Sequence, residues 1–304
     1  MIKNRNIDPL AGIDPMKING SNIGEARYVV RANSNAHNLL SPRVSSTLLY
    51  VCDGTADDVE INAAISESKG GTNSYVYVFP GAYSLTGAIT MSGRSSMHLV
   101  GVNGLGMDVG CVGAAALTQT GAYQNVIMEA YGELTGFQII NKAGYAAVTM
   151  ADGKWRSNIH NNYFHMTQGT ACNIIDCAGS GMSYGNISHN RFETWVGGSI
   201  TSAITCAGAT AVTISNNWIN NYSGTMDTAI NTGAGAQCLI VDNIVGDGSG
   251  AGTITVGIAF GAGTTVVGNR CQLPTGTAFT GGTANRSFVD NRDAYAGGET
   301  CIES

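Results

Sequence analysis

The sequence predicts an all-β fold, a right-handed parallel β-helix, on three observations. A six-residue motif, here called the first phrase, recurs along the second half of the chain. A second, apolar motif, the second phrase, recurs at the same period, and the composition suits short strands. The chain has 304 residues, of which 43% are hydrophobic, only 12% are charged and 42 are glycine. Charged residues make up about 25% of an average globular protein, and helix-rich enzymes need them on their solvent faces. Many short strands joined by tight Gly and Asn turns fit this balance better.

The first phrase has an apolar residue, two mostly polar ones, an Asn, one variable residue and usually another apolar residue. It is written IHNNYF, ISHNRF, ISNNWI, IVDNIV, VVGNRC and FVDNRD, with its Asn at Asn162, Asn190, Asn217, Asn243, Asn269 and Asn291. The intervals between these Asn residues are 28, 27, 26, 26 and 22 residues. Self-similarity at such a period indicates a solenoid, in which each unit buries its apolar face against its neighbours. We therefore expect coils of 22–28 residues.

The second phrase centres on one apolar residue in each unit, at Val148, Ile175, Ile204, Ile230, Ile258 and Phe279. Two strand signals in about 26 residues leave no room for a helix in every unit, so the repeat predicts stacked parallel strands, about 4.8 Å apart. At a sharp corner an Asn tolerates the left-handed backbone, and its amide can hydrogen-bond to the Asn of the next coil. We expect the six Asn residues to be such corners and to form an internal ladder.

The stretch YVCDGTADDVEINAAISES, followed by SYVYVFPGAYSL and MHLVGVNGLG, resembles the N-terminal part of the pectate-lyase-like β-helix superfamily. It is similar to the tailspike-type members found in phage and microbial genomes, and the resemblance covers roughly residues 48–293. The resemblance implies a short capping helix, about residues 57–68, over the open end of the β-helix. Asp57 or Asp58 would be its N-cap, and its apolar face on the first coil would be Ile61, Ala64 and Ile65. The fold itself hosts lyases, hydrolases and inert spikes, so it implies little about activity.

Residues 1–45 follow a different pattern, and we expect them to form an extended arm or anchor ahead of a β-helix domain at 46–304. Two Ile-Asp-Pro units favour extended or turn backbone. The wording IDPLAGIDPMKI resembles short segments of phage tail fibres and other virion proteins. A flexible leader is the alternative, but exposed apolar residues are costly, which favours an arm that orders against a neighbour or a particle. The anchoring residues would be Ile7, Leu10, Ile13, Met16 and Ile18.

No catalytic residue is assigned, although weak acid candidates exist. Enzymes that cleave glycosidic bonds need two carboxylates, about 6.5–9.5 Å apart for inversion and about 5–5.5 Å for retention. Asp242 and Asp290 each precede a ladder Asn and should lie two coils apart, about 9.6 Å by strand spacing. An Asp beside a corner Asn is also ordinary turn chemistry, which we prefer. Glu193 and Asp227 are two further weak candidates.

The residue after the ladder Asn reads Tyr163, Arg191 and Trp218 in the first three coils. Stacked outward, these side chains could form a subunit interface, since Tyr, Trp and Arg dominate interface hot spots. They could also contact a glycan by laying rings against sugar faces, or be plain surface. Of these three interpretations we prefer the subunit interface.

The sequence predicts no cofactor, no metal and no nucleic-acid partner. A net charge of −6 gives no electrostatic reason for DNA or RNA binding. The eight cysteines show no CxxC spacing and suit a reduced compartment as small buried hydrophobes. His160, His165 and His189 fall in three different columns of the repeat, so they should not converge on a metal. Neither a signal peptide nor a membrane span is expected.

These observations predict a non-enzymatic phage virion protein, either a capsid decoration (cement) protein or a short tail spike. It would be a homotrimer on the virion surface, assembled in the host cytoplasm and in contact with other capsid or tail proteins. Flat solenoid sides favour such trimers because they cover one another's strands. The alternative is a tailspike-type polysaccharide depolymerase, a glycoside hydrolase or lyase, acting on a host surface glycan.

Overall fold

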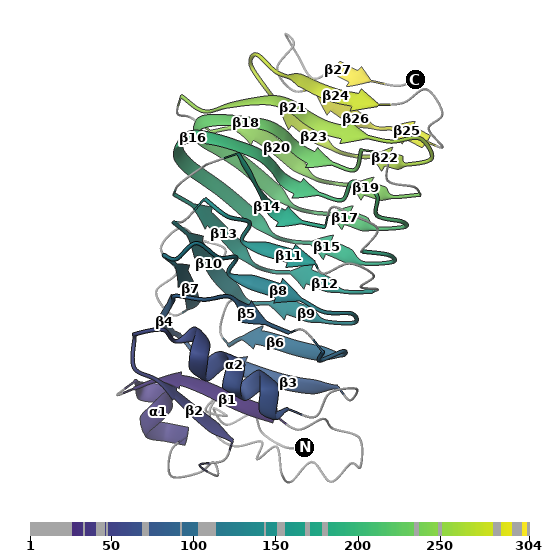
Figure 1. The fold of residues 1–304 in the computed structure, drawn as a ribbon. Helices are drawn as coiled ribbons and strands as arrows, with labels where there is room; N and C mark the ends of the chain where they lie inside the picture. The colour runs from purple at the N-terminus through teal and green to yellow at the C-terminus, as the bar shows by residue number, and fades with distance from the viewer. Residues whose placement is uncertain are drawn as a thin grey trace, which may run out of the picture.

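The computed structural model is a right-handed parallel β-helix whose coils stack from β2 and β1 at one end to β27 at the other (Figure 1). It describes residues 26–32, 34–40, 46, 48–68, 73–91, 93–102, 114–142, 144–150, 156–167, 171–177, 182–233, 237–248, 251–281, 287–293 and 300–302. The expected anchoring residues Ile7, Leu10, Ile13, Met16 and Ile18 lie outside this part of the chain.

The coil has three walls. The first wall is one sheet of parallel strands in the order β2 (Leu49–Cys52), β1 (Ala26–Arg31), β3 (Ser74–Val78), β6 (Met97–Gly101), β9 (Glu133–Thr135), β12 (Asn158–His160), β15 (Asn186–Ser188), β17 (Thr213–Ser215), β19 (Leu239–Val241), β22 (Thr265–Val267) and β25 (Ser287–Val289).

The second wall starts after the corner at which the ladder Asn sits. Its strands are β4 (Gly81–Leu85), β7 (Ala115–Gln119), β10 (Phe137–Asn141), β13 (Tyr163–Met166), β16 (Arg191–Thr205), β18 (Trp218–Asn231), β20 (Ile244–Asp247), β23 (Arg270–Gln272), β26 (Asn291–Asp293) and β27 (Thr300–Ile302).

The third wall shares the two longest strands with the second. The far ends of β16 and β18 join β5 (Ile89–Thr90), β8 (Val126–Met128), β11 (Val148–Met150), β14 (Cys172–Asp176), β21 (Thr253–Phe260) and β24 (Thr277–Gly281). Register shifts around Trp195, between the two halves of β16, mark where this strand turns from one wall to the next.

The strand register confirms both repeat phrases. The second phrase forms one inward column, in which Val148 pairs with Ile175, Ile175 with Ile204, and so on through Ile230, Ile258 and Phe279. Side chains alternate inward and outward along each strand, and the inward ones form one continuous apolar core. This core is what holds the coils together, because each coil covers the apolar edge of the one before it.

The Asn ladder is confirmed, with one correction to its backbone. Each of the six ladder residues is at most 1% exposed, and each side-chain oxygen from Asn190 onward accepts hydrogen bonds from the preceding ladder Asn at 2.9–3.2 Å. The left-handed residue of each corner is the one before it: Asn161, His189, Asn216, Asp242, Gly268 or Asp290, with φ between 53° and 67°. The expectation that the ladder Asn itself is left-handed was therefore wrong. Asn, Asp, His and Gly accept that backbone, which leaves the ladder Asn free to point inward.

A short helix, α2 (Asp58–Glu67), lies against the first coils and confirms the expected apolar face. Ile61, Ala64 and Ile65 are at most 2% exposed. Asp57 is the N-cap residue, but its carboxylate makes no cap bond to the helix. Instead it accepts the backbone N–H groups of Gly54 and Ser84, both at 2.7 Å. The Asp57 side chain thus ties the loop before α2 to β4.

The N-terminal boundary of the β-helix differs from the expectation, and the structure shows how the last coil ends. In the stretch expected as an arm, β1 pairs in parallel with β3, and helix α1 (Asn35–Leu40) follows it. The sheet thus begins by residue 26, before the expected boundary at 45, because Val29 and Val30 are buried in it. At the other end β27 runs antiparallel to β26, so the chain's own tail pairs with that strand.

Candidate functional site

Outward side chains of the second wall form what we call the aromatic face: Tyr163, Arg191, Glu193, Trp195, Trp218 and Tyr222. It arises because β13, β16 and β18 lie in register, so that Tyr163 pairs with Arg191 and Arg191 with Trp218. The alternating positions Phe164 and Phe192 point inward and stack at 4.8 Å between ring centroids. The predicted Tyr–Arg–Trp column is therefore real, and a stacked aromatic pair supports it from inside.

Arg191 lies between the two rings of this column. Its guanidinium carbon is 4.4 Å from the Trp218 ring centroid and 5.9 Å from that of Tyr163. Tyr163 is only 3% exposed and Trp218 is 42% exposed. Only the Trp218 end of the stack is therefore strongly exposed to a ligand or a partner.

Glu193 is the completely buried member of the aromatic face, and three neighbours hold it. It accepts the Tyr163 hydroxyl at 2.8 Å, the Arg191 Nε–H at 2.8 Å and the Trp195 Nε1–H at 3.4 Å. A second guanidinium nitrogen of Arg191 lies 2.5 Å from the same carboxylate. These contacts neutralise the charge of Glu193 and fix the rings around it, which is a positioning role.

Trp195 and Tyr222 extend the face toward the third wall. Their rings are parallel to within 10° with centroids 4.3 Å apart, and Trp195 is 50% exposed. Ile244, which follows Trp218 in the same column, is 49% exposed. Large apolar side chains presented together on a flat sheet suit contact with another apolar surface or with sugar rings. Alignment of the repeats within the sequence did not identify Trp195 and Tyr222 as part of this face.

The structure separates two of the acid candidates and keeps the other two in one column. Glu193 pairs with Asn220 on the second wall, whereas Asp227 is an exposed residue of the part of β18 that pairs with the third wall. Asp242 and Asp290 do share a column, separated by the coil that carries Gly268. Both are exposed corner residues with φ near 54°, as turn chemistry predicts.

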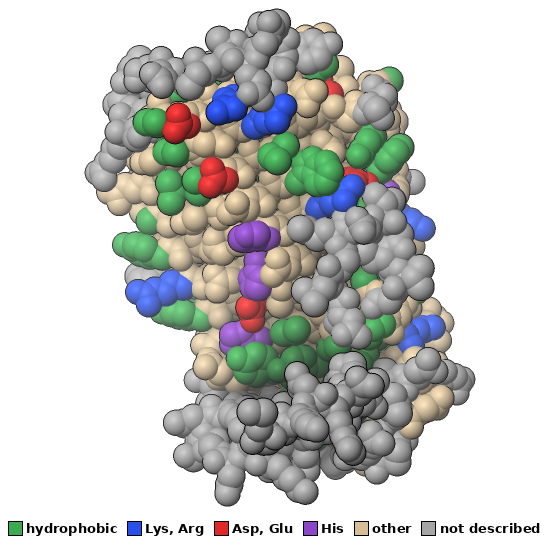
Figure 2. Space-filling model, turned by 180° about the vertical axis from the view of Figure 1, so that it is seen from behind, with side chains coloured by type: hydrophobic (Ala, Val, Ile, Leu, Met, Phe, Trp, Pro, Cys, Tyr) green, Lys and Arg blue, Asp and Glu red, His purple; other side chains and the backbone are tan. Residues whose placement is uncertain are grey.

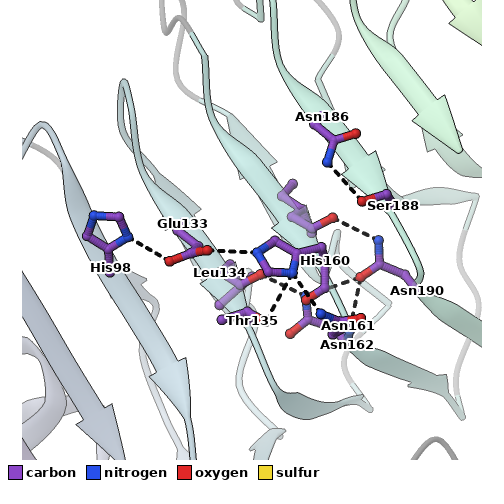
Figure 3. A network of polar contacts seen from close by, with 11 residues as sticks. His98, Glu133, Leu134, Thr135, His160, Asn161, Asn162, Asn186, Ser188 and Asn190 are labelled. Atoms are coloured by element: carbon purple, nitrogen blue, oxygen red, sulfur yellow. Dashed lines mark hydrogen bonds and ion pairs between the residues drawn. The ribbon is translucent and has the colours of Figure 1, made fainter. Parts of the chain in front are cut away.

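A second polar group, the imidazole–carboxylate column, lies on the outside of the first wall and consists of His98, Glu133 and His160. Glu133 lies between the two imidazoles (Figure 3): one carboxylate oxygen is 2.6 Å from His98 Nδ1 and the other is 2.7 Å from His160 Nε2. Histidine side chains and an acidic one follow one another along this face in the space-filling view (Figure 2). The Tyr75 ring stacks on His98 at 4.3 Å.

The polar contacts of this column hold both imidazoles and the carboxylate in place. The Asn161 amide nitrogen, which can only donate, lies 2.9 Å from His160 Nδ1. His160 thus contacts Asn161 through one ring nitrogen and Glu133 through the other. The bonds from His160 and His98 lower the pKa of Glu133 to about 2, against a smaller opposing effect of burial. The column is an anchored carboxylate whose two imidazoles bind opposite oxygens, so it has no shared centre for a metal.

The cluster best placed for a metal in the described residues is Cys52, Asp57 and Glu60, whose ligand atoms lie within 4.8 Å of one another. Its donors do not fit a cation. Both Asp57 oxygens already accept backbone N–H groups, and the Arg31 guanidinium lies 3.2 Å away. Burial also raises the pKa of the Cys52 thiol, which keeps it protonated. We assign this cluster to the loop that holds α2.

The comparisons with known proteins leave the chain's family open. No family model, no curated protein and no solved structure matches it. Neither of the two helices in the described residues is long and apolar enough to cross a membrane.

Proposed function

We propose that the chain is a non-enzymatic structural protein of a phage particle, a β-helical unit that assembles as a homotrimer on the virion surface. Its role would be that of a capsid decoration (cement) protein or of a short tail spike, in contact with other virion proteins. The resemblance to tailspike-type β-helices and the phage-like wording of residues 1–45 support this proposal. The surroundings of the acid candidates support it as well. Glu193 forms an ion pair with Arg191, and Asp242 and Asp290 are corner residues.

The aromatic face carries the proposal. Trp195, Trp218 and Ile244 are between 42% and 50% exposed, on the outside of a flat wall in a chain with few charges. Aromatic residues and Arg are enriched at subunit interfaces, and their burial against a second copy would remove this apolar surface from water. Arg191 and Glu193 hold the rings in place before contact, which reduces the entropy lost on assembly.

Sedimentation velocity of the purified chain tests assembly. We expect the wild type to sediment as a trimer and Trp218→Ala, alone or with Trp195→Ala, to shift the distribution to monomers with an unchanged circular dichroism spectrum. Tyr123→Ala is the matched control, since Tyr123 is 52% exposed and follows β7, which β10 separates from β13, the nearest strand of the aromatic face. A monomeric wild type, or a trimer unaffected by both Trp substitutions, would refute the proposed interface.

The place on the particle is tested by gold-labelled antibody against the chain on intact virions. Label over the shell supports a decoration protein, and label confined to the tail supports a spike. Absence of label from particles that contain all other structural proteins would overturn the virion role.

Polysaccharide binding or depolymerisation is the second candidate function, favoured by the parallel Trp195 and Tyr222 rings. Exposed aromatic rings pack against sugar faces as readily as against protein. An assay of new reducing ends or of unsaturated products on host polysaccharide tests cleavage, with Asp242→Asn and Asp290→Asn as variants. Binding by the wild type that is lost in a trimeric Trp195→Ala variant would favour the glycan over the interface.

A further inference from the structure

Two buried cysteines are stacked in adjacent coils of the third wall. Asp176 at the end of β14 pairs with Thr205 at the end of β16, which places Cys177 opposite Cys206. The register continues past both strands, since the Cys177 N–H donates to Thr205 O and the Cys206 N–H donates to Asn231 O, each at 2.8 Å. Both side chains are 0% exposed and belong to the apolar core, so the two thiols point the same way.

The backbone spacing of this placement suits a disulfide. Stacked parallel strands lie about 4.8 Å apart, and the Cα atoms of disulfide-bonded cysteines lie about 4.4–6.8 Å apart. The Cys177 side chain is also the largest cause of the raised pKa of the Cys206 thiol, as expected of two neighbouring thiols. Bond formation therefore requires a small approach of two side chains and no change of register.

We propose that Cys177 and Cys206 are a modification site, at which a disulfide joins two coils when the folded protein meets a small-molecule disulfide. In the first step a thiolate of the pair attacks one sulfur of glutathione disulfide, which forms a mixed disulfide and releases one glutathione thiolate. The second cysteine then attacks the protein sulfur of the mixed disulfide and releases the second glutathione. Two protein thiols are oxidised and one glutathione disulfide is reduced, so electrons and protons balance.

The surroundings of the pair keep it reduced until the coil opens locally. The hydrogen bond with Cys177, followed by burial, raises the pKa of the Cys206 thiol, and a protonated thiol is a poor nucleophile. Because neither side chain is exposed, oxidation must follow a transient opening of the third wall. Its rate should therefore rise in urea concentrations too low to unfold the chain.

The experiment incubates the full chain with glutathione disulfide, alkylates the remaining thiols in denaturant, and digests without reduction. Trypsin separates the two cysteines, because Arg191 lies between them. We expect a cross-linked pair of peptides in the wild type, in Cys172→Ser and in Cys238→Ser, and no such pair in Cys177→Ser or Cys206→Ser. The two controls are chosen because Cys172 and Cys238 lie on the same tryptic peptides as the proposed partners.

A stability measurement keeps the proposal testable if a serine variant folds poorly. The oxidised wild type should unfold at a higher temperature than the reduced wild type, and dithiothreitol should reverse the shift, since a cross-link constrains the unfolded chain. Complete alkylation of Cys177 and Cys206 after long exposure in low urea would overturn the proposal. So would a cross-link that survives in both Cys177→Ser and Cys206→Ser.

Discussion

At the scale of single residues, the ladder Asn is a buried amide whose every hydrogen-bonding group has a protein partner. In Asn217 the amide nitrogen donates to Ile187 O at 2.9 Å and to Asn243 Oδ1 at 3.0 Å. Its oxygen accepts both the backbone N–H and the side-chain amide of Asn190, each at 3.1 Å. The Asn217 amide stabilises the corner only while the ladder Asn residues of both adjacent coils are present, because each unsatisfied buried donor costs about 1–3 kcal/mol.

Replacement of Asn217 by Leu should lower the free energy of unfolding by about 3–5 kcal/mol, since it orphans buried donors on Asn190 and an acceptor on Asn243. Urea unfolding followed by circular dichroism measures the change. Asn216→Gly is the control, because Asn216 is exposed, has φ 54° and precedes the same corner. Glycine accepts that backbone, so this variant should be as stable as the wild type or slightly more so. Equal stability of Asn217→Leu and Asn216→Gly would contradict the ladder's role.

Glu133 should make folding stability depend on acid pH. Its pKa is lowered from 4.5 to about 2 by the bonds from His160 and His98, so the folded state holds its proton less tightly than the unfolded state. This contribution is complete above pH 4.5 and is lost as the pH falls toward 2. Glu133→Gln, whose amide accepts only one of the two imidazole donors, should cost about 1–2 kcal/mol at pH 6, allowing for partial exposure. The cost should vanish near pH 2, as measured by thermal unfolding across this range.

Asp247 should have the opposite effect. Burial raises its pKa from 3.8 to about 6, and one of its oxygens is a buried atom without a hydrogen-bond partner among the described residues. The folded state therefore binds the proton more tightly, so this contribution is complete below pH 3.8 and is lost as the pH rises through 6. We expect Asp247→Asn to stabilise the chain by about 1–2 kcal/mol at pH 8 and to change little at pH 3.5. Destabilisation of Asp247→Asn at pH 8 in urea unfolding would show that the charged carboxylate stabilises the folded state.

At the scale of elements, α2 is the cover of the first coils, and its two faces allow a matched comparison. Ile61 is 0% exposed against the core, whereas Val59 on the same helix is 59% exposed. Ile61→Ala should lower the free energy of unfolding by about 2–4 kcal/mol, because it removes buried methyl groups and leaves a cavity. Val59→Ala should change it by less than about 0.5 kcal/mol. Equal effects in calorimetry would mean that the helix does not cap the core.

The repeat elements were predictable because a fixed period aligns equivalent residues without any knowledge of three-dimensional structure. The same reasoning failed where a coil breaks the pattern. Glu133 belongs to a coil whose corner is Gly136, with φ 81°, followed by Phe137, so no Asn marked its register with His160. The corner itself was placed one residue late, because Asn suits both the left-handed position and the ladder position.

The aromatic face was found only in part for a similar reason. Trp195 lies at a register shift and pairs with Ser223, while its ring stacks on Tyr222. Counting residues from the ladder Asn cannot locate a contact across such an irregularity. The sequence therefore predicted the columns that follow the period, and the structure was needed for contacts between columns, such as that of Trp195 with Tyr222.

At the scale of the whole molecule, stability should depend on protein concentration if copies cover the aromatic face. The coils contact mainly their neighbours, so each wall of a monomer keeps its outer surface in water. Assembly that binds only the folded chain stabilises it by mass action, and each tenfold rise in concentration adds on the order of 1.4 kcal/mol per association step. The thermal unfolding midpoint of the wild type should therefore rise with concentration in scanning calorimetry. In Trp218→Ala the midpoint should stay constant. A constant midpoint in the wild type as well would mean that copies of this chain do not cover the exposed Trp195 and Trp218 rings.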